Sequence, residues 1–369
     1  MVINTEKLQE VCKKVLDAVD NSSVLPVSSS VELLTEGRKL SINITNMEYY
    51  VSITLDLDNE VDSFRVVVDA HLFLNLIAKM TTEDIELTIN DKSLVVKGNG
   101  TYKVPIITDA KGIVNVPKIT IDNVTNEFTI NNEDLQNILN FNTKEVMKNI
   151  VNKPVQKMYY LDNQGCITFT NSACVNSFTL NTDVKLIFNL KLVKLFKLLK
   201  SDVINVKLGY DKVGTTTQAK ITFKEEGTEI TSILLNDESL INDVPVYAIR
   251  GRANKVYPYN VTLRRTELLK AIARISFFLT KAESVVILSF DRNEVKMYDL
   301  LKVNNDCIPY ESANLTLDNP YIIGIDVFNL KNTLEGCSDE YINLSFGDGK
   351  ALVMTRGNIK DVIPHTVIA

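Results

Sequence analysis

The feature that most constrains this chain is a pattern of a capped helix followed by two strands, which occurs three times. The copies open at Asp69, Asn189 and Asp326. Asp and Asn favour the first position of a helix because their side chains accept hydrogen bonds from its free N–H groups. A pattern that recurs in the same order predicts a repeated structural unit. Apolar residues follow each cap at helical spacing, at Leu72, Phe73, Leu76 and Ile77, then Leu192, Val193 and Phe196, then Leu330 and Leu334.

An alternating strand begins about 15 or 16 residues after each cap. Apolar side chains occupy every second position, which is typical of a sheet with one buried face. These strands are predicted at residues 85–89, 204–208 and 342–346. Turn-forming residues and a second strand follow each of them. The turns are expected at residues 90–91, 209–214 and 347–349, and the second strands at 94–97, 219–223 and 351–354.

A second helix is predicted upstream of the first in each copy, led by Leu8, Leu135 and Leu268. Further strands lie between the two helices of a copy, for example at residues 40–45 and 166–170. Long Val and Ile runs alternating with helices, typical of a buried parallel sheet, are missing. The sequence therefore predicts an α+β fold of three tandem repeats with antiparallel sheets and two helices per repeat. Domain boundaries are predicted to give residues 1–123, 124–252 and 253–369.

The predicted helices at residues 189–200 and 264–281 carry basic residues opposite their apolar faces. Two interpretations are open. The basic residues of each helix can simply be solvated, or the basic faces of the two helices can together form a surface that attracts phosphates. The formal net charge of −6 argues against a surface that is basic everywhere, but not against one basic patch. In the first unit Lys7 and Lys14 have Glu10 and Asp17 nearby, so the pattern is less clear there. The candidate DNA-facing residues are Lys191, Lys194, Lys197, Lys200, Arg264, Lys270, Arg274 and Lys281.

Sequence signals of catalysis are missing. His71 and His365 are the only histidines, and neither has other ligands at metal-binding spacing. The Gly347–Lys350 segment resembles a phosphate loop, but it joins two predicted strands where a P-loop must open a helix. The five cysteines form no C-x-x-C pair, which indicates free thiols in a reducing cytoplasm. We therefore expect no enzyme activity, no catalytic residue, no cofactor and no metal; an enzyme whose site is assembled from distant residues remains an alternative.

Several segments together resemble one known family. They are residues 24–27 (Val-Leu-Pro-Val), 44–48 (Ile-Thr-Asn-Met-Glu), 68–80, 93–108, 167–175 and the tail 361–364 (Asp-Val-Ile-Pro). In order and spacing they are similar to the bacterial DNA polymerase III β subunit, the DNA sliding clamp, along essentially the whole chain. The resemblance implies a cytoplasmic processivity factor for DNA replication, a head-to-tail homodimeric ring whose helices face a central hole. Its implied partners are double-stranded DNA bound without sequence preference, the replicative polymerase and an ATP-dependent clamp loader, with no membrane involved.

The resemblance also implies two protein-binding surfaces. The dimer interface would pair Tyr102 and Val104 with Phe278 and Leu279. The partner-peptide groove would use Val155, Thr170, Asn171, Ser172, Ala173, Cys174, Val175, Pro245, Val362, Ile363 and Pro364.

Two departures from the family affect this groove. The chain has Ser-Ala-Cys-Val at residues 172–175 where the family commonly has Gly-His-Arg-Leu, and it continues past the usual end with residues 365–369. We therefore expect an altered groove with altered peptide preference. A clamp-like peptide-binding hub or decoy that does not encircle DNA is the alternative function, and a host chain and a phage- or plasmid-encoded one both fit.

Overall fold

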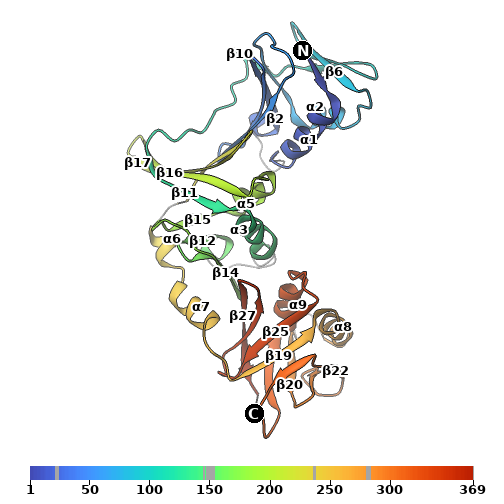
Figure 1. The fold of residues 1–369 in the computed structure, drawn as a ribbon, viewed down its shortest axis with the longest axis vertical. Helices are drawn as coiled ribbons and strands as arrows, with labels where there is room; N and C mark the ends of the chain where they lie inside the picture. The colour runs from blue at the N-terminus through green and yellow to red at the C-terminus, as the bar shows by residue number, and fades with distance from the viewer. Residues whose placement is uncertain (21–24, 144–145, 147–153, 236–237, 280–283, 369) are drawn as a thin grey trace. The chain divides into compact units, whose positions relative to one another are not determined.

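The computed structural model describes residues 1–20, 25–143, 146, 154–235, 238–279 and 284–368 (Figure 1). The chain divides into two compact units. Unit one comprises Met1–Asn132 and Lys194–Leu235, and unit two comprises Glu133–Val193 and Asn236–Ala369. Among the described residues every strand pair is antiparallel, which confirms the predicted α+β class. In that part of the chain no helix combines the length and the apolar character needed to span a bilayer.

Unit one contains an eight-stranded sheet and a four-stranded sheet. In the larger sheet β18 pairs with β4, placing Ile230 opposite Val51 and joining strands about 180 residues apart in sequence. The strand order is β11 (Val124–Asn131), β16 (Val203–Val213), β17 (Thr216–Glu225), β18 (Thr228–Ile233), β4 (Tyr49–Asp56), β3 (Lys39–Thr45), β2 (Ser30–Glu36) and β5 (Arg65–Asp69). The smaller sheet has the order β1 (Val2–Asn4), β6 (Asp84–Asn90), β7 (Ser93–Lys97) and β8 (Thr101–Pro105). A separate ribbon pairs β9 (Thr108–Asp109) with β10 (Gly112–Ile113).

Unit two contains a thirteen-stranded sheet in which the last strand, β27 (Ile359–Val367), pairs with three others. β27 contacts β14 through residues 359–362, β26 through residues 359–364 and β24 through residues 365–367. The main path runs β15 (Leu186–Phe188), β12 (Tyr159–Asp162), β13 (Gly165–Phe169), β14 (Ala173–Ser177), β27, β24 (Tyr321–Asp326), β20 (Val285–Phe290), β21 (Glu294–Tyr298) and β22 (Asn305–Pro309). The remaining strands are β19 (Tyr259–Arg264), β23 (Ser312–Asn314), β25 (Tyr341–Phe346) and β26 (Ala351–Arg356).

The three predicted capped helices form where the sequence places them. Asp69, Asn189 and Asp326 each accept a hydrogen bond from the backbone N–H three residues on, at 2.7, 2.9 and 2.8 Å. The predicted strand pairs also form after each helix, as β6 and β7, β16 and β17, and β25 and β26. The capped helices are α2 (Ala70–Ile77), α5 (Leu190–Leu195) continued by the 3-10 turn η4 (Phe196–Leu198), and α9 (Val327–Glu335).

The upstream helices are also present, and their leading leucines Leu8, Leu135 and Leu268 are buried. They are α1 (Thr5–Leu16), α3 (Asn132–Asn137) continued by the π-helical turn η2 (Ile138–Asn142), and α8 (Arg265–Ser276). α8 ends five residues before the predicted limit, and Lys281 lies outside the described residues. Short additional helices are η1 (Pro26–Ser29), η3 (Pro154–Lys157), α6 (Glu238–Asn242) and α7 (Val246–Ala253).

One predicted turn, at residues 209–214, is too long. Residues 209–213 continue strand β16, and the chain reverses at Gly214, whose φ is +62°. A glycine is required at position 209 for a reason other than a turn. A Cβ there would lie 2.4 Å from the carbonyl oxygen of Asn123 and 2.1 Å from the Ile121 side chain, so only glycine allows this close approach. The turn predicted at residues 347–349 is correct, with φ of +117° at Gly347 and +73° at Gly349.

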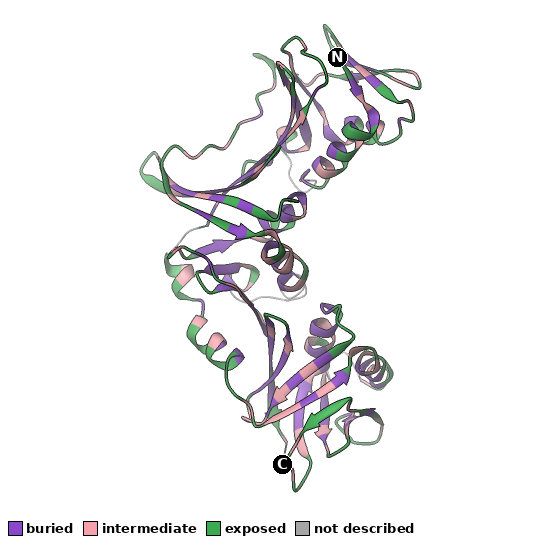
Figure 2. Cartoon of the chain, in the orientation of Figure 1, coloured by how far each residue is buried: buried purple, intermediate pink, exposed green. Residues whose placement is uncertain are grey.

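Buried residues in Figure 2 follow the inner faces of the strands and helices in each unit. In unit two one core cluster packs α8 and α9 on β19, β20, β24 and β25, and it includes Phe290 and Phe346, whose ring centroids are 4.1 Å apart. A second cluster of unit two lies between β13, β14, β26, β27 and α7. This second cluster contains several of the predicted groove residues.

Candidate peptide groove and basic surface

The second cluster, which we call the groove cluster, brings together residues from distant parts of the sequence. Of the predicted groove residues, Val155, Ala173, Val175 and Val362 belong to it. The register of β14 on β27 places Ala173 directly opposite Val362, and that of β26 on β27 places Val353 opposite Val362. Because side chains alternate along a strand, these residues share one face.

Two predicted groove residues face the other way. Cys174 and Ile363 are fully buried on the opposite face of the same strands. Ile363 belongs to the core cluster around Phe290, and Cys174 lies near Asp361. The prediction that their side chains line the groove is therefore wrong, since it took consecutive residues from a strand in which only every second one reaches a given face.

The other predicted residues lie at the margins of the groove cluster. Thr170 and Ser172 form a tight turn in which the Thr170 N–H donates to the Ser172 carbonyl at 2.7 Å, and Asn171 at its tip is exposed. Pro245 is the exposed residue that precedes α7, and Pro364 is exposed on β27 next to Ala351 of β26.

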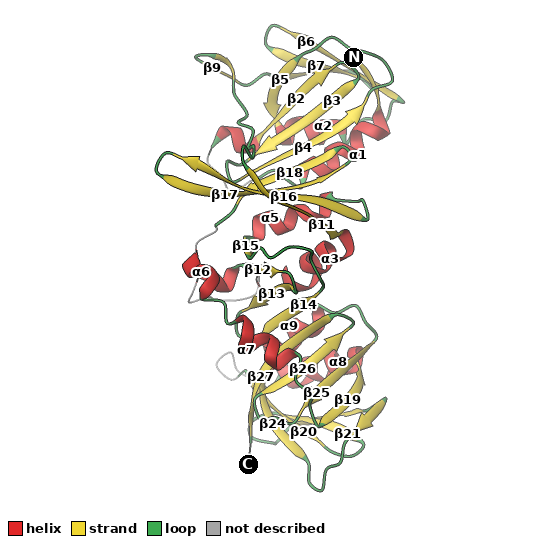
Figure 3. Ribbon diagram, turned by 60° about the vertical axis from the view of Figure 1, so that its left-hand side comes forward, coloured by secondary structure: helices red, strands yellow, loops and turns green. Residues whose placement is uncertain are grey.

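Several residues of this cluster were missed by the sequence analysis. Helix α7 contributes Ile249 and Ala253, and it is held by Arg250, which donates to both carboxylate oxygens of Asp162 at 2.6 Å. The helix is visible beside β27 in Figure 3. Weak periodicity over eight residues gave no signal for it in the sequence. The partly buried side chains at the edge of the cluster are Met158, Phe169, Leu240, Ile241, Val246 and Tyr257.

A buried ion pair lies on the far side of the groove strands. Arg356 of β26 donates from Nε to Asp361 Oδ2 at 2.9 Å, and its guanidinium lies over the Phe141 ring, 4.4 Å from the centroid. Both side chains are nearly inaccessible, with exposures of 4% and 2%. Burial raises the pKa of Asp361, and the adjacent Arg356 guanidinium opposes that shift. The pair fixes β26 against β27 directly behind Val362.

The lysines of α5 and η4 project into solvent as predicted. Lys191, Lys194 and Lys200 are exposed, while the apolar residues between them are buried. Lys197 is only half-exposed, and its Nζ lies 3.0 Å from Asp17 Oδ1 at the end of α1. This carboxylate comes from a helix about 180 residues away in sequence.

Three of the candidate DNA-facing residues around α8, Arg264, Lys270 and Arg274, are paired with acids. Arg264 is within 4 Å of both Glu311 and Glu340, and a hydrogen bond to the Tyr341 hydroxyl raises its pKa. Lys270 lies 3.0 Å from Glu267. Two of these acids, Glu311 and Glu340, lie on loops outside the helix, where a helix-by-helix reading of charge cannot find them.

Arg274 makes the closest of these contacts. It donates from Nε and Nη2 to the two carboxylate oxygens of Asp306 on β22, at 2.5 and 3.0 Å, and this hydrogen bonding raises its pKa. Exposed pairs contribute about 0–1 kcal/mol. A phosphate could therefore compete with them.

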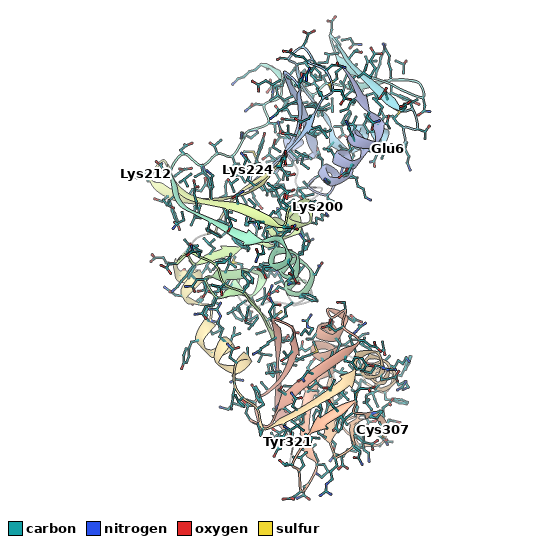
Figure 4. The ribbon with its side chains drawn as sticks, viewed as in Figure 1. Glu6, Lys200, Lys212, Lys224, Cys307 and Tyr321 are labelled. Atoms are coloured by element: carbon teal, nitrogen blue, oxygen red, sulfur yellow. The ribbon has the colours of Figure 1, made fainter. Side chains whose placement is uncertain are left out.

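A cavity of about 910 Å³ lies in unit one between α1, β4 and β18. Figure 4 labels Lys200 and Lys224 at this side of the unit. Lysines and carboxylates are equally numerous in its lining, with Lys7, Lys14, Lys39, Lys118, Lys200 and Lys224 against Glu10, Glu36, Asp56, Glu225, Glu226 and Glu229. This balance gives the cavity no preference for anions.

The predicted dimer-interface residues differ in accessibility. Tyr102 on β8 is 41% exposed and Phe278 is 58% exposed, but Val104 is 1% exposed and Leu279 packs against the core of unit two. The prediction that the Val104 side chain reaches a partner is therefore wrong, since it points into the core of unit one. Phe277, which the sequence analysis did not select, is 87% exposed. β8 and β22 are edge strands of their sheets in the described part of the chain.

The C-terminal segment runs away from the groove cluster. Residues 365–367 pair with residues 323–325 of β24, and His365 is buried beside Tyr321. Burial lowers the pKa of His365.

Among the described residues no group of His, Cys, Asp and Glu side chains is arranged to bind a metal ion. Cys307 is exposed, and Cys12, Cys166, Cys174 and Cys337 are buried free thiols.

Residues 1–111 match the protein family described as DNA polymerase III beta subunit, N-terminal domain. The whole chain superposes on solved sliding-clamp structures. The DNA polymerase sliding clamp of Bacillus subtilis shares 15% identity with a TM-score of 0.76, and the match covers 100% of this chain and 99% of that one. The DNA polymerase III subunit beta of Pseudomonas aeruginosa shares 14% identity with a TM-score of 0.77 and covers 100% of both chains. For the beta subunit of Thermotoga maritima the identity is 14%, the TM-score 0.76, and the coverage 100% and 99%. No curated protein matches the sequence.

Proposed function

Since the chain begins with an N-terminal domain of the DNA polymerase III β subunit family and has the sliding-clamp fold throughout, we propose that it is a DNA sliding clamp. It encircles duplex DNA as a head-to-tail homodimeric ring and tethers the replicative polymerase and other DNA-processing proteins. The observation that carries the proposal is the match of the entire chain to solved clamps. The chain divides into clamp domains 1–123, 124–252 and 253–369, with two helices of each facing the hole.

The mechanism is topological. A closed ring keeps a polymerase on its template with only weak DNA contacts, because leaving requires the ring to open. Contacts to phosphates without base reading allow the ring to slide. The ring acts in the cytoplasm without chemistry of its own, and an ATP-dependent loader opens it.

The subunit interface is formed by the edge strands β8 and β22. Exposed edge strands have unpaired backbone groups that can pair with another chain. Tyr102 lies on β8, while Phe277 and Phe278 follow α8, which packs on β22. These large exposed side chains support a head-to-tail contact in which β8 of one subunit meets β22 of the other.

The DNA-facing surface is proposed to comprise Lys191, Lys194, Lys197, Lys200, Arg264, Lys270, Arg274 and Lys281. The exposed lysines of α5 attract phosphates through their charge. The basic residues of α8 contribute by exchanging their surface carboxylate partners for phosphates.

The partner-peptide groove is proposed at the groove cluster. Its margins are Thr170, Asn171, Ser172, Pro245 and Pro364, and its floor is Val155, Ala173, Val175 and Val362. Short peptides with apolar side chains bind such apolar surfaces between elements.

One observation favours a second function. Arg264, Lys270 and Arg274 are each close to carboxylates, which weakens the attraction of this surface for DNA. A clamp-like peptide-binding hub or decoy would keep the groove and lose the ring. It would sediment as a monomer.

The test combines sedimentation with retention on DNA. A sliding clamp sediments as a dimer and, once loaded, stays on circular DNA but slides off linear DNA. The variant K194E/K197E/K270E/R274E should lower processivity in primer extension at least tenfold with the dimer intact, because it removes contacts to DNA phosphates. Each lost contact should also make the slope of log K against log salt concentration shallower by about 0.9. Unchanged processivity would contradict the proposed basic lining, and equal retention on the two DNA forms would contradict the ring.

A further inference from the structure

Helix α6 (Glu238–Asn242) covers part of the groove cluster with two apolar side chains. Leu240 and Ile241 are half-buried and pack against the cluster, while Glu238, Ser239 and Asn242 are exposed. The helix precedes Pro245 and α7 (Figure 3). The surface proposed for partner peptides therefore already has a peptide segment of this chain on it.

The structure indicates that α6 is held weakly. A helix of five residues is far too short to be stable alone, because its first turn is costly to form. None of its residues is fully buried. Its contacts with the groove cluster are made by the two partly exposed aliphatic side chains of Leu240 and Ile241.

The neighbouring helix α7 is anchored far more firmly. It buries Ile249 and Ala253, and Arg250 binds Asp162 through two hydrogen bonds of 2.6 Å with side chains only 12% and 11% exposed. The contrast between the two helices indicates that α7 is a fixed wall of the groove and that α6 is the part able to leave.

We propose that α6 is an internal occupant of the groove, which partner peptides must displace. Leu240 and Ile241 hold the positions that apolar side chains of a partner take when α6 leaves. This inference rests on the proposed function, because it assumes that partner peptides dock on the groove cluster. It also identifies the partner class as short segments carrying two neighbouring aliphatic residues, the chemistry of α6 itself.

A free peptide with the sequence of the α6 segment can test this proposal. A labelled peptide with the sequence of residues 238–243 is titrated against the full chain and against the variant L240S/I241S, in which α6 can no longer compete. We expect the peptide to bind the variant at least tenfold more tightly than the unaltered chain. Binding should shift the methyl resonances of Ile249 and Val362, and the same peptide with both serines should not bind.

Each other outcome overturns the proposal. Equal affinity for both chains would mean that α6 does not occupy the site. A short tether gives an attached segment an effective concentration on the order of millimolar. The absence of binding at several millimolar peptide would therefore mean that α6 could not stay on the groove either.

Controls separate folding and ring formation from occupancy. Tyr247→Ser on α7 removes an apolar side chain that is 93% exposed, and it should leave peptide affinity unchanged. If L240S/I241S misfolds, a variant with residues 238–242 replaced by alternating Gly and Ser takes its place. Sedimentation and retention on circular DNA report on the ring independently. A monomer with the expected peptide behaviour would thus contradict only the ring, and a dimer without that behaviour would contradict only the internal occupant.

Discussion

Two ion pairs of unit two, Arg356–Asp361 and Arg274–Asp306, use the same chemical groups in opposite surroundings. Arg356 and Asp361 are 4% and 2% exposed, whereas Arg274 is 55% exposed and Asp306 15%. Removing charges from water is costly, so a buried pair must stay complete once it is formed. An exposed pair is screened and contributes little, so its members can exchange partners. Arg356 therefore holds two strands together, whereas Arg274 contributes little to stability and can exchange its partner.

The largest expected effect is on the buried pair. Arg356→Met should lower the free energy of unfolding by about 3–5 kcal/mol, because it leaves the Asp361 carboxylate buried without its partner. The midpoint of urea unfolding measures this loss. The matched control Arg274→Met should shift that midpoint far less, because its exposed ion pair is screened by solvent. Equal losses of free energy of unfolding in the two variants would contradict the contrast between the buried and the exposed ion pair.

The buried His365 tests how burial affects a single titratable side chain. The titratable and charged groups of its neighbourhood are Asp348, Lys350 and Tyr321. Because the folded pKa is lowered, the unfolded chain binds more protons below its usual value of about 6.5. Stability should therefore fall as the pH drops from about 6.5 towards 5, by at most about 1.4 kcal/mol per pH unit.

Urea unfolding of the unaltered chain and of His365→Gln at several pH values measures this dependence. The variant should lose the slope between pH 6.5 and 5 while keeping the steeper fall below that range, where carboxylates become protonated. An unchanged slope in the variant would show that other groups cause the pH dependence.

The smallest expected effect is on the exposed pair. Asp306→Asn should change the free energy of unfolding by less than about 1 kcal/mol. It should strengthen DNA binding a few-fold at low salt, because Arg274 then lacks a competing carboxylate. Filter binding at several salt concentrations tests this, with Asp318→Asn, an exposed acid on the loop between β23 and β24, as the control. Weaker DNA binding of Asp306→Asn would show that Asp306 positions Arg274 rather than competing with phosphate.

Much of the local structure was predictable because its causes are local. The caps at Asp69, Asn189 and Asp326 depend on atoms three residues apart, and the alternating strands depend on side-chain direction along one segment. The error at Gly209 has the opposite origin. Its close neighbour, the Asn123 carbonyl, is 86 residues away in sequence, and no local pattern reports such a contact.

The candidate groove was predicted only in part for a similar reason. The right strands were identified, but Cys174 and Ile363 were placed on the wrong face because a resemblance assigns stretches of sequence and not side-chain directions. Helices α6 and α7 were missed because short helices carry little periodicity. The acids beside Arg264 and Arg274 come from loops and a strand that only folding brings to α8.

The amino-acid sequence alone was enough to predict the repeated capped helices, the alternating strands and the resemblance to sliding clamps, and it contains no recognisable catalytic motif. The folded structure was needed to learn which face each groove residue takes, which charges are buried or neutralised, and that α6 lies on the groove cluster. The physical reason is the separation along the sequence of the interacting residues. Helix caps and strand alternation depend on neighbours a few residues away, whereas burial and ion pairing depend on which distant segments meet.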